Sequence, residues 1–293
     1  MLMILPTLAY FIIFRYGPIT GIVIAFQDFI PRMGSGFFKS ILESEWVGLD
    51  NFGRFIHSMN GVQIVVNTIL ISLYKIIFGF PAPIILAILL NEIRNDKFKK
   101  VTQTICYLPH FISWVILAGI IRIMISPDYG ILIPVFKALN MDVINFLGEP
   151  ALFRSLLVST DIYQSIGWGS IIYLAAISGI DHELYEAAAI DGAGKLKKLL
   201  YITLPSISST IVVMFILRIG KILSAGFDQV FNLYNPAVYQ VADIIDTYIY
   251  RVGLVQAQFS YTAAIGFFQS LIGFTLVLTT NFIAKRTGQE GIW

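Results

Sequence analysis

The sequence predicts an all-α protein that crosses a membrane about six times and forms a single domain over residues 1–293. Hydrophobic residues make up 57% of the chain and charged residues only 13%, which is about half the charged share of a soluble domain. The mean hydropathy is +0.77. Six mostly apolar stretches have the roughly 17–25 residues or more that a helix needs to cross the hydrocarbon. They are residues 2–26, 62–90, 105–125, 156–180, 207–223 and 263–284.

The first stretch is interrupted by Arg15, Gly17 and Pro18. Proline has no amide hydrogen and disfavours a helical conformation in the residue before it. We therefore expect the first helix to end near Tyr16, with the remainder re-entrant or lying along the membrane interface. No basic segment or cleavage site accompanies this apolar run, so it is predicted to be a retained span and not a signal peptide.

Prolines and cations mark two later stretches. Pro81 and Pro83 are expected to kink the second, since each removes a backbone hydrogen bond. Lys75 lies near the centre of that stretch, and Arg218 and Lys221 lie in the end of the fifth. No partner for these three cations is evident in the sequence. We therefore expect them to contact a neighbouring membrane subunit, water or the membrane interface.

The distribution of Lys and Arg over the loops predicts the orientation. Residues 91–104, 181–205 and 285–293 hold nine of these cations, whereas the opposite loops are about twice as long and hold about six. We expect the nine-cation side, and with it both termini, to be cytoplasmic. The nine are Arg94, Lys97, Lys99, Lys100, Lys195, Lys197, Lys198, Lys285 and Arg286.

The loop at residues 181–205 is the most polar segment in the second half of the chain. Asp181 is a good N-cap, and carboxylates in the following turns favour the positive end of a helix. Gly192 and Gly194 permit a sharp reversal of the chain. A second helix is predicted to begin near Lys195 and to end before Pro205, which cannot continue it. The sequence therefore predicts two short helices joined by a glycine turn, suited to bind in a groove of another protein.

This loop resembles the EAA loop of ABC importer permeases. In that pattern, EAA is followed by three residues and a glycine, and about nine residues later by a hydrophobic residue, any residue, and LP. Asp191 and Ala193 match the version found in sugar importers. The matching residues are Glu186, Ala187, Ala188, Asp191, Gly192, Ala193, Ile202, Leu204 and Pro205.

The resemblance to carbohydrate importer permeases extends over nearly the whole chain. Residues 16–29 and 80–95 are similar to a branch whose members import oligosaccharides derived from polysaccharides, whereas residues 233–240 replace the glycine-rich stretch of the commoner sugar permeases. This departure puts details of binding-protein docking or of the substrate in doubt. Further similar segments are residues 46–55, 107–113, 126–132, 161–168, 226–236 and 246–254.

The resemblance implies a type I ABC importer permease in a bacterial cytoplasmic membrane, in contact with lipid and working on oligosaccharides. It further implies a second, non-identical permease, two cytoplasmic ATPase subunits that bind ATP and magnesium, and an extracytoplasmic solute-binding protein. The unpartnered cations support a pseudo-symmetric heterodimer of the two permeases. An importer permease for another solute class and an ion-coupled secondary transporter stay open as alternatives, although the internal symmetry of many secondary transporters is not evident.

Other site chemistries are poorly supported. The segment GAGK at residues 192–195 resembles a phosphate-binding loop, but Ala189 and Leu196 occupy positions that require glycine and Ser or Thr. Cys106 is the only cysteine, and three scattered histidines form no metal motif. A net charge of +2 does not favour nucleic acid. We therefore expect a non-catalytic subunit with no cofactor of its own.

The fourth stretch supplies candidates for contact with the transported sugar. Asp161, Gln164 and Trp168 follow one another at helical spacing, and an ionisable residue within a span is a functional candidate. Aromatic rings stack on sugar faces, while amides and carboxylates bind hydroxyls. The alternative interpretation is that Asp161 caps a helix at the outer interface, or pairs with Arg122 or Arg154.

Overall fold

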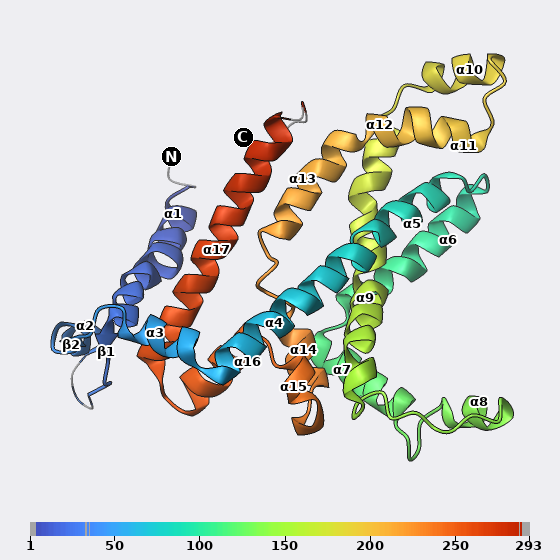
Figure 1. Cartoon of the computed structure of the whole chain (residues 1–293). Coiled ribbons are helices and arrows are strands. Elements are labelled where there is room, and N and C mark those ends of the chain that lie inside the picture. Colours follow the sequence, from blue (N-terminus) through green and yellow to red (C-terminus); the bar gives the residue numbers. More distant parts are fainter. Residues whose placement is uncertain (1–3, 33, 35, 287, 289–293) are drawn as a thin grey trace. The chain divides into compact units, whose positions relative to one another are not determined.

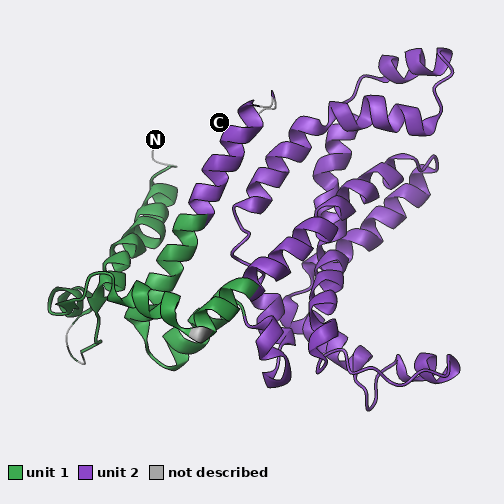
Figure 2. Ribbon diagram, in the orientation of Figure 1, with its two compact units in different colours: residues 1–66, 244–272 green, residues 67–243, 273–293 purple. Residues whose placement is uncertain are grey.

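The computed structural model describes residues 4–32, 34, 36–286 and 288, and within them the chain is predominantly helical, as predicted. The strands of the described residues are the two-residue β1 (Gln27–Asp28) and β2 (Glu45–Trp46), which pair antiparallel. The chain divides into two compact units, one of residues 1–66 and 244–272 and the other of residues 67–243 and 273–293 (Figure 2). This division does not test the single domain expected from the sequence, which stays a prediction.

The first unit has an aromatic centre. The ring of Phe26 stacks on Trp46 at 5.7 Å and lies against Phe52 at 5.3 Å and Phe267 at 5.9 Å. These rings bury large apolar areas and fix the small β1–β2 ladder beside the first helix. The elements are α1 (Leu5–Phe11), a π-helical turn (Ile12–Tyr16), a 3₁₀ segment (Gly17–Phe26), α2 (Phe37–Leu42), α3 (Asp50–His57), α16 (Ile245–Ile249) and a π-helical turn (Tyr250–Val255).

The second unit contains most of the long helices (Figure 1). Two helices, α4 and α17, run across the boundary between the units. The elements are α4 (Met59–Tyr74), a π-helical turn (Lys75–Gly79), α5 (Pro81–Asn91), α6 (Asp96–Tyr107), a 3₁₀ turn (Leu108–Phe111), α7 (Trp114–Ile125), α8 (Ile133–Ala138), α9 (Pro150–Ser178), α10 (His182–Ile190), α11 (Lys195–Lys198), a π-helical turn (Leu199–Thr203), α12 (Leu204–Ser206), α13 (Ser208–Ile219), α14 (Phe227–Leu233), a 3₁₀ turn (Pro236–Val238), α15 (Tyr239–Ala242) and α17 (Phe259–Arg286).

Three helices of the described residues are long and apolar enough to cross a membrane: Leu5–Phe26, Asn60–Asn91 and Phe259–Arg286. Two bent helix pairs also qualify, which raises the number to as many as five. The fourth predicted span forms as the 29-residue helix α9, which is long enough to cross but does not pass the same test of apolarity. The six predicted stretches thus all contain helix, although two of them are bent.

The third and fifth predicted spans are not straight. The helices Asp96–Phe111 and Trp114–Ile125 meet at 102°. Ser113 lies between them, and its hydroxyl accepts a hydrogen bond from the amide of Ile116, so that a new helix begins there. Lys195–Ser206 and Ser208–Ile219 meet at 61°. The fifth helix ends at Ile219, short of the expected residue 223.

Prolines within the helices are accommodated by widened turns. The first helix was expected to end near Tyr16, and this expectation is wrong, since the chain stays helical to Phe26. Each of three π-helical turns ends two residues before a proline, namely Pro18, Pro81 or Pro205. In an α-helix the proline ring would collide with the carbonyl four residues earlier. The wider turn moves that carbonyl aside, and the helix continues.

The core of the second unit lies where α5 and α6 pack along α9 (Figure 1). Gly167 on α9 is where the α6 backbone comes closest, since a Cβ atom built there would overlap the carbonyl of Cys106 and lie 2.9 Å from the amide nitrogen of Tyr107. Gly169 faces Pro83 of α5, where an added Cβ would approach to 3.1 Å. Both glycines are packing contacts, as expected for glycines within a bundle of spans.

Candidate functional site

The loop of residues 181–205 folds as the sequence predicts, into two helices joined by a glycine turn (Figure 1). The carboxylate of Asp181 accepts a hydrogen bond from the amide of Glu183 at 3.0 Å and so caps α10. The helix ends in a Schellman motif: the Ala193 amide donates to the Ala188 carbonyl at 2.8 Å, and the Gly192 amide donates to the Ala189 carbonyl at 3.1 Å.

Gly192 occupies the left-handed conformation that this motif requires, with φ of 73°. Other residue types adopt this conformation only with strain. By contrast, Gly194 has φ of −71° and needs no glycine for its backbone. The reversal between the two helices therefore depends on Gly192.

The second helix of the loop continues one residue past Pro205, to Ser206, so the expected end before Pro205 is wrong. The π-helical turn before the proline explains the difference, because the Leu204 amide donates to the Leu199 carbonyl five residues earlier. This wider ring leaves room for the proline within a continuous helix.

The base of the loop is fixed to the second unit. Ile202 and Leu204, from the hydrophobic-x-LP part of the pattern, pack against a core cluster. The hydroxyls of Tyr185 and Thr203 are 2.9 Å apart and join α10 to the second helix. The core cluster consists of Ala87, Tyr173, Ile177, Ile180 and Ile207.

The loop also exposes large apolar side chains. Ile190 is 88% exposed and Tyr201 77% exposed, and Leu184 and Leu196 are also exposed. Lys195 adds an ion pair with Glu92 at 2.6 Å. Of the predicted coupling residues, Ala188, Ala193 and Leu204 are half-buried, whereas the exposed ones are Glu186, Ala187, Asp191, Gly192 and Pro205. The loop of residues 181–205 is thus held at its base and exposes apolar side chains elsewhere, as a docking surface for another protein does. We call this loop the knob.

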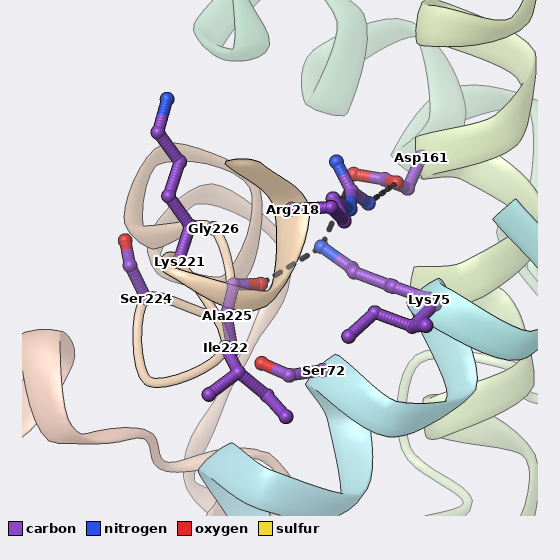
Figure 3. Close-up of a pocket in the computed structure, with 10 residues that line it drawn as sticks. Ser72, Lys75, Asp161, Arg218, Lys221, Ile222, Ser224, Ala225 and Gly226 are labelled. Atoms are coloured by element: carbon purple, nitrogen blue, oxygen red, sulfur yellow. Dashed lines mark hydrogen bonds and ion pairs between the residues drawn. The ribbon is translucent and has the colours of Figure 1, made fainter. Parts of the chain in front are cut away.

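A second constellation lies around Asp161 on α9 (Figure 3). One carboxylate oxygen is 3.2 Å from Nζ of Lys75, and the other is 3.3 Å from Nη2 of Arg218. Lys75 lies on the π-helical turn after α4, and Arg218 on the last turn of α13. Three helices that are far apart in sequence therefore meet at one carboxylate.

The Lys75 ammonium is the buried centre of this cluster. Its side chain is 5% exposed, and it also donates to the Ala225 carbonyl at 2.8 Å and to the side-chain oxygen of Gln229. The amide nitrogen of Gln229 in turn donates to Thr160 and to the Leu157 carbonyl, each at 2.7 Å. All the donors of the ammonium thus have acceptors, as a buried charge requires.

These contacts correct two expectations. Lys75 and Arg218 have a partner within the chain, contrary to the expectation from the sequence. The alternative pairing of Asp161 with Arg122 or Arg154 is also wrong. Arg122 donates to the Asn232 carbonyl at 2.6 Å, and Arg154 donates to Asn67 and the Val241 carbonyl.

The two other substrate candidates face a different neighbour. Gln164 donates to the carbonyl of Ile112 at 3.0 Å, at the break between α6 and α7. Trp168 stacks on His110 with ring centroids 4.7 Å apart and meets Phe111 edge-on at 5.6 Å. Asp161 therefore contacts Lys75 and Arg218, whereas Gln164 and Trp168 contact residues at the break between α6 and α7, and the contact of these three residues with a sugar stays a prediction.

Sequence reasoning missed the Lys75 and Arg218 partners of Asp161. A signal was present, because three ionisable residues within predicted spans carry opposite charges, and such residues usually pair. Among the described residues, no group of three or more His, Cys, Asp or Glu side chains could hold a metal ion.

Comparisons with known proteins agree with this geometry. The family model of the binding-protein-dependent transport system inner membrane component matches residues 79–289. Protein LplB of Bacillus subtilis (strain 168) is 42% identical over 292 residues, covering 100% of this chain and 90% of LplB. The polygalacturonan/rhamnogalacturonan transport system permease protein YteP of the same organism is 45% identical over 292 residues, covering 100% of this chain and 89% of YteP.

Among solved structures, a chain of a bacterial alginate ABC transporter, crystallised with an alginate pentasaccharide-bound periplasmic protein, superposes with a TM-score of 0.90. It is 38% identical, and the match covers 99% of this chain and 95% of that one. The matching family model describes an inner membrane component of a transport system. This chain therefore belongs to the family of binding-protein-dependent transport system inner membrane components and has the type I ABC permease fold.

Proposed function

We propose that this chain is one of two permease subunits of an ATP-driven oligosaccharide importer, with residues 181–205 as its coupling loop. The observation that carries the proposal is the knob built on α10 and α11, rigid at its base and apolar on its exposed side. The relatives support the substrate class, because a permease for polygalacturonan/rhamnogalacturonan and a transporter of alginate are both similar to this chain.

In this proposal the chain binds neither ATP nor magnesium. Two cytoplasmic ATPase subunits bind them, one under each permease, and a movement of the ATPases is passed to the spans through Glu186, Gly192 and their neighbours. The similar alginate transporter was solved with a periplasmic protein that carries the sugar, which supports an extracytoplasmic solute-binding protein as a further partner. Both termini lie in the cytoplasm, and the whole chain acts as one permease domain within the bacterial membrane.

The second permease is now supported by different evidence. Lys75 and Arg218 do not need a second subunit as partner, since Asp161 pairs with both. The loop at residues 181–205 gives this chain one surface for an ATPase, so that two ATPase subunits require a second such loop. A non-identical permease with its own coupling loop would complete the pathway and engage the second ATPase.

Co-purification tests the coupling role. The chain is co-expressed with the neighbouring permease and ATPase genes and purified through a tag on this chain. Ile190→Asp, which places a charge on the exposed face of the knob, is expected to lose the ATPase and ATP-driven oligosaccharide uptake in proteoliposomes. The matched control is Leu139→Asp, since Leu139 is 63% exposed and lies outside the loop. An Ile190→Asp complex that retains the ATPase and full uptake would contradict the proposal.

Uptake assays distinguish the solute class. The complex with its binding protein is expected to import oligosaccharides only when ATP is present. Uptake of another solute class, with no oligosaccharide uptake, would favour the alternative importer. Uptake driven by an ion gradient without ATP would favour a secondary transporter.

A further inference from the structure

The cluster around Asp161 forms one wall of an open pocket with a cavity volume of about 110 Å³ (Figure 3). The pocket lies within the second unit, between the π-helical turn that carries Lys75, the middle of α9, and the segment after α13. Polar and charged side chains dominate its lining, which is unusual for a pocket among apolar spans. They are Ser72, Lys75, Asp161, Arg218, Lys221 and Ser224.

The charges of this pocket do not balance. Lys75, Arg218 and Lys221 face a single carboxylate, that of Asp161, so the lining carries an excess of two positive charges. The Lys75–Asp161 pair is internally neutral, with Lys75 buried and Asp161 half-buried. The excess therefore belongs to Arg218 and Lys221, and in a weakly polar environment such an excess attracts an anion strongly.

Arg218 and Lys221 have donors to spare. The guanidinium of Arg218 uses one nitrogen for Asp161 at 3.3 Å, and its side chain remains 40% exposed. A guanidinium has five N–H groups in a planar fork that fits a carboxylate. The side chain of Lys221 is exposed and extends away from Asp161 (Figure 3). Its ammonium makes no contact that we find in the described part of the chain.

A buried hydroxyl supplies a separate indication of a ligand. Ser72 is 5% exposed, and its Oγ lacks any hydrogen-bond partner among the described residues, although it lines this same pocket. Buried polar atoms without a partner are rare, because they lose their contacts with water and gain nothing in return. The hydroxyl of Ser224 also lines the pocket. A ligand group that enters from the pocket would supply the partner that the Ser72 hydroxyl lacks.

We propose that this pocket is a transient binding site for the carboxylate and hydroxyl groups of an acidic, uronate-containing oligosaccharide on its way through the permease. Arg218 and Lys221 bind the carboxylates, and Ser72 and Ser224 bind neighbouring hydroxyls. Asp161 and Lys75 are positioning residues, since they hold the Arg218 side chain at the pocket wall. This inference rests on the proposed function and narrows its substrate to acidic sugars.

Binding is measured on the complete complex of both permeases and both ATPases, in nanodiscs of zwitterionic lipid without the solute-binding protein. The probe is trigalacturonate, observed by saturation-transfer NMR, with maltotriose as a neutral sugar of equal length. Trigalacturonate is expected to bind weakly, with a Kd raised about tenfold by Arg218→Gln and severalfold by Lys221→Gln, because charge-assisted hydrogen bonds are lost. Arg218→Lys should restore part of the loss.

Two further variants separate a built site from general attraction to positive charge. Ser72→Ala removes no charge and is expected to raise the Kd severalfold. Lys97→Gln removes an exposed charge from α6, outside the pocket, and is expected to leave the Kd unchanged. The inference is overturned if Arg218→Gln binds trigalacturonate like the unchanged complex, if Ser72→Ala and Lys97→Gln have equal effects, or if maltotriose binds as tightly.

The result also separates this inference from the proposed function. A complex that imports neutral oligosaccharides with ATP but does not bind trigalacturonate would overturn the acidic-sugar site alone. A complex that imports no oligosaccharide at all would overturn the proposed function.

Discussion

The buried ion pair of Lys75 and Asp161 allows a quantitative test of what holds the second unit together. Replacing Asp161 with Asn removes the carboxylate but leaves the Lys75 ammonium in a site where its side chain is only 5% exposed. Breaking a buried pair in this way costs about 3–5 kcal/mol. Lys75 keeps the Ala225 carbonyl and Gln229 as acceptors. We therefore expect a loss of about 3 kcal/mol in the free energy of unfolding, at the lower end of that range.

The double variant makes the prediction specific. Lys75→Met alone should cost about 2 kcal/mol, since it leaves a buried oxygen of Gln229 without its donor. Lys75→Met combined with Asp161→Asn leaves no buried charge, and its cost should also be about 2 kcal/mol, less than the sum of the two single costs. Arg218→Gln should cost less than about 1 kcal/mol, because an ion pair of a 40% exposed side chain is screened by its surroundings.

Reversible unfolding by SDS in mixed micelles measures these free energies, with helicity as the signal. The purified subunit is used for all four variants, and the same detergent composition is kept throughout. Costs that add within about 0.5 kcal/mol would show that the two side chains do not interact. An Arg218→Gln cost as large as that of Asp161→Asn would show that the buried centre of the cluster is Arg218 and not Lys75.

Three further outcomes follow from the structure. Gly192→Val should uncouple ATP hydrolysis from uptake, because the left-handed residue is strained by about 1–3 kcal/mol, whereas Gly194→Ala should leave coupling intact; normal substrate-stimulated hydrolysis in Gly192→Val would disprove the role of the turn. Gly167→Val should lower the yield of folded protein by forcing α9 away from the α6 backbone, while Gly119→Ala, where an added Cβ meets nothing within 4 Å, should not; equal yields, measured by size-exclusion chromatography, would argue against the close approach. Trp168→Ala should change the uptake of some oligosaccharides more than complex assembly, and unchanged uptake of every sugar would leave Trp168 as a packing residue of the α6–α7 break.

Local chemistry explains why the fold of the loop at residues 181–205 could be predicted. Asp181 as a cap and Gly192 as a left-handed turn depend on neighbours within a few residues, so the sequence alone specifies them. The sequence also predicted the start of the second helix at Lys195. The predicted end of this helix is wrong, because a proline was expected to end the helix. The π-helical turn before Pro205 instead accommodates the proline within it.

The Asp161 cluster could not be predicted in the same way. The contact of Asp161 with Arg218 joins residues 57 positions apart, and its existence depends on how α4, α9 and α13 pack. Hydropathy also hid the bend at Ser113, because the apolar residues on both sides look like one continuous span. The Ser113 cap starts a new helix within this apolar stretch. The bend could have been predicted only by recognising Ser113 as an N-cap.

The widened turns before the prolines set the positions at which these helices bend most easily. A π-helical turn can in principle travel along a helix by exchanging one hydrogen bond at a time, but a proline has no amide hydrogen to exchange. Each turn is therefore trapped beside its proline. In the loop of residues 181–205 the trapped turn is Leu199–Thr203. Pro205 thus sets the position of this turn, and the 61° bend to α13 follows it directly.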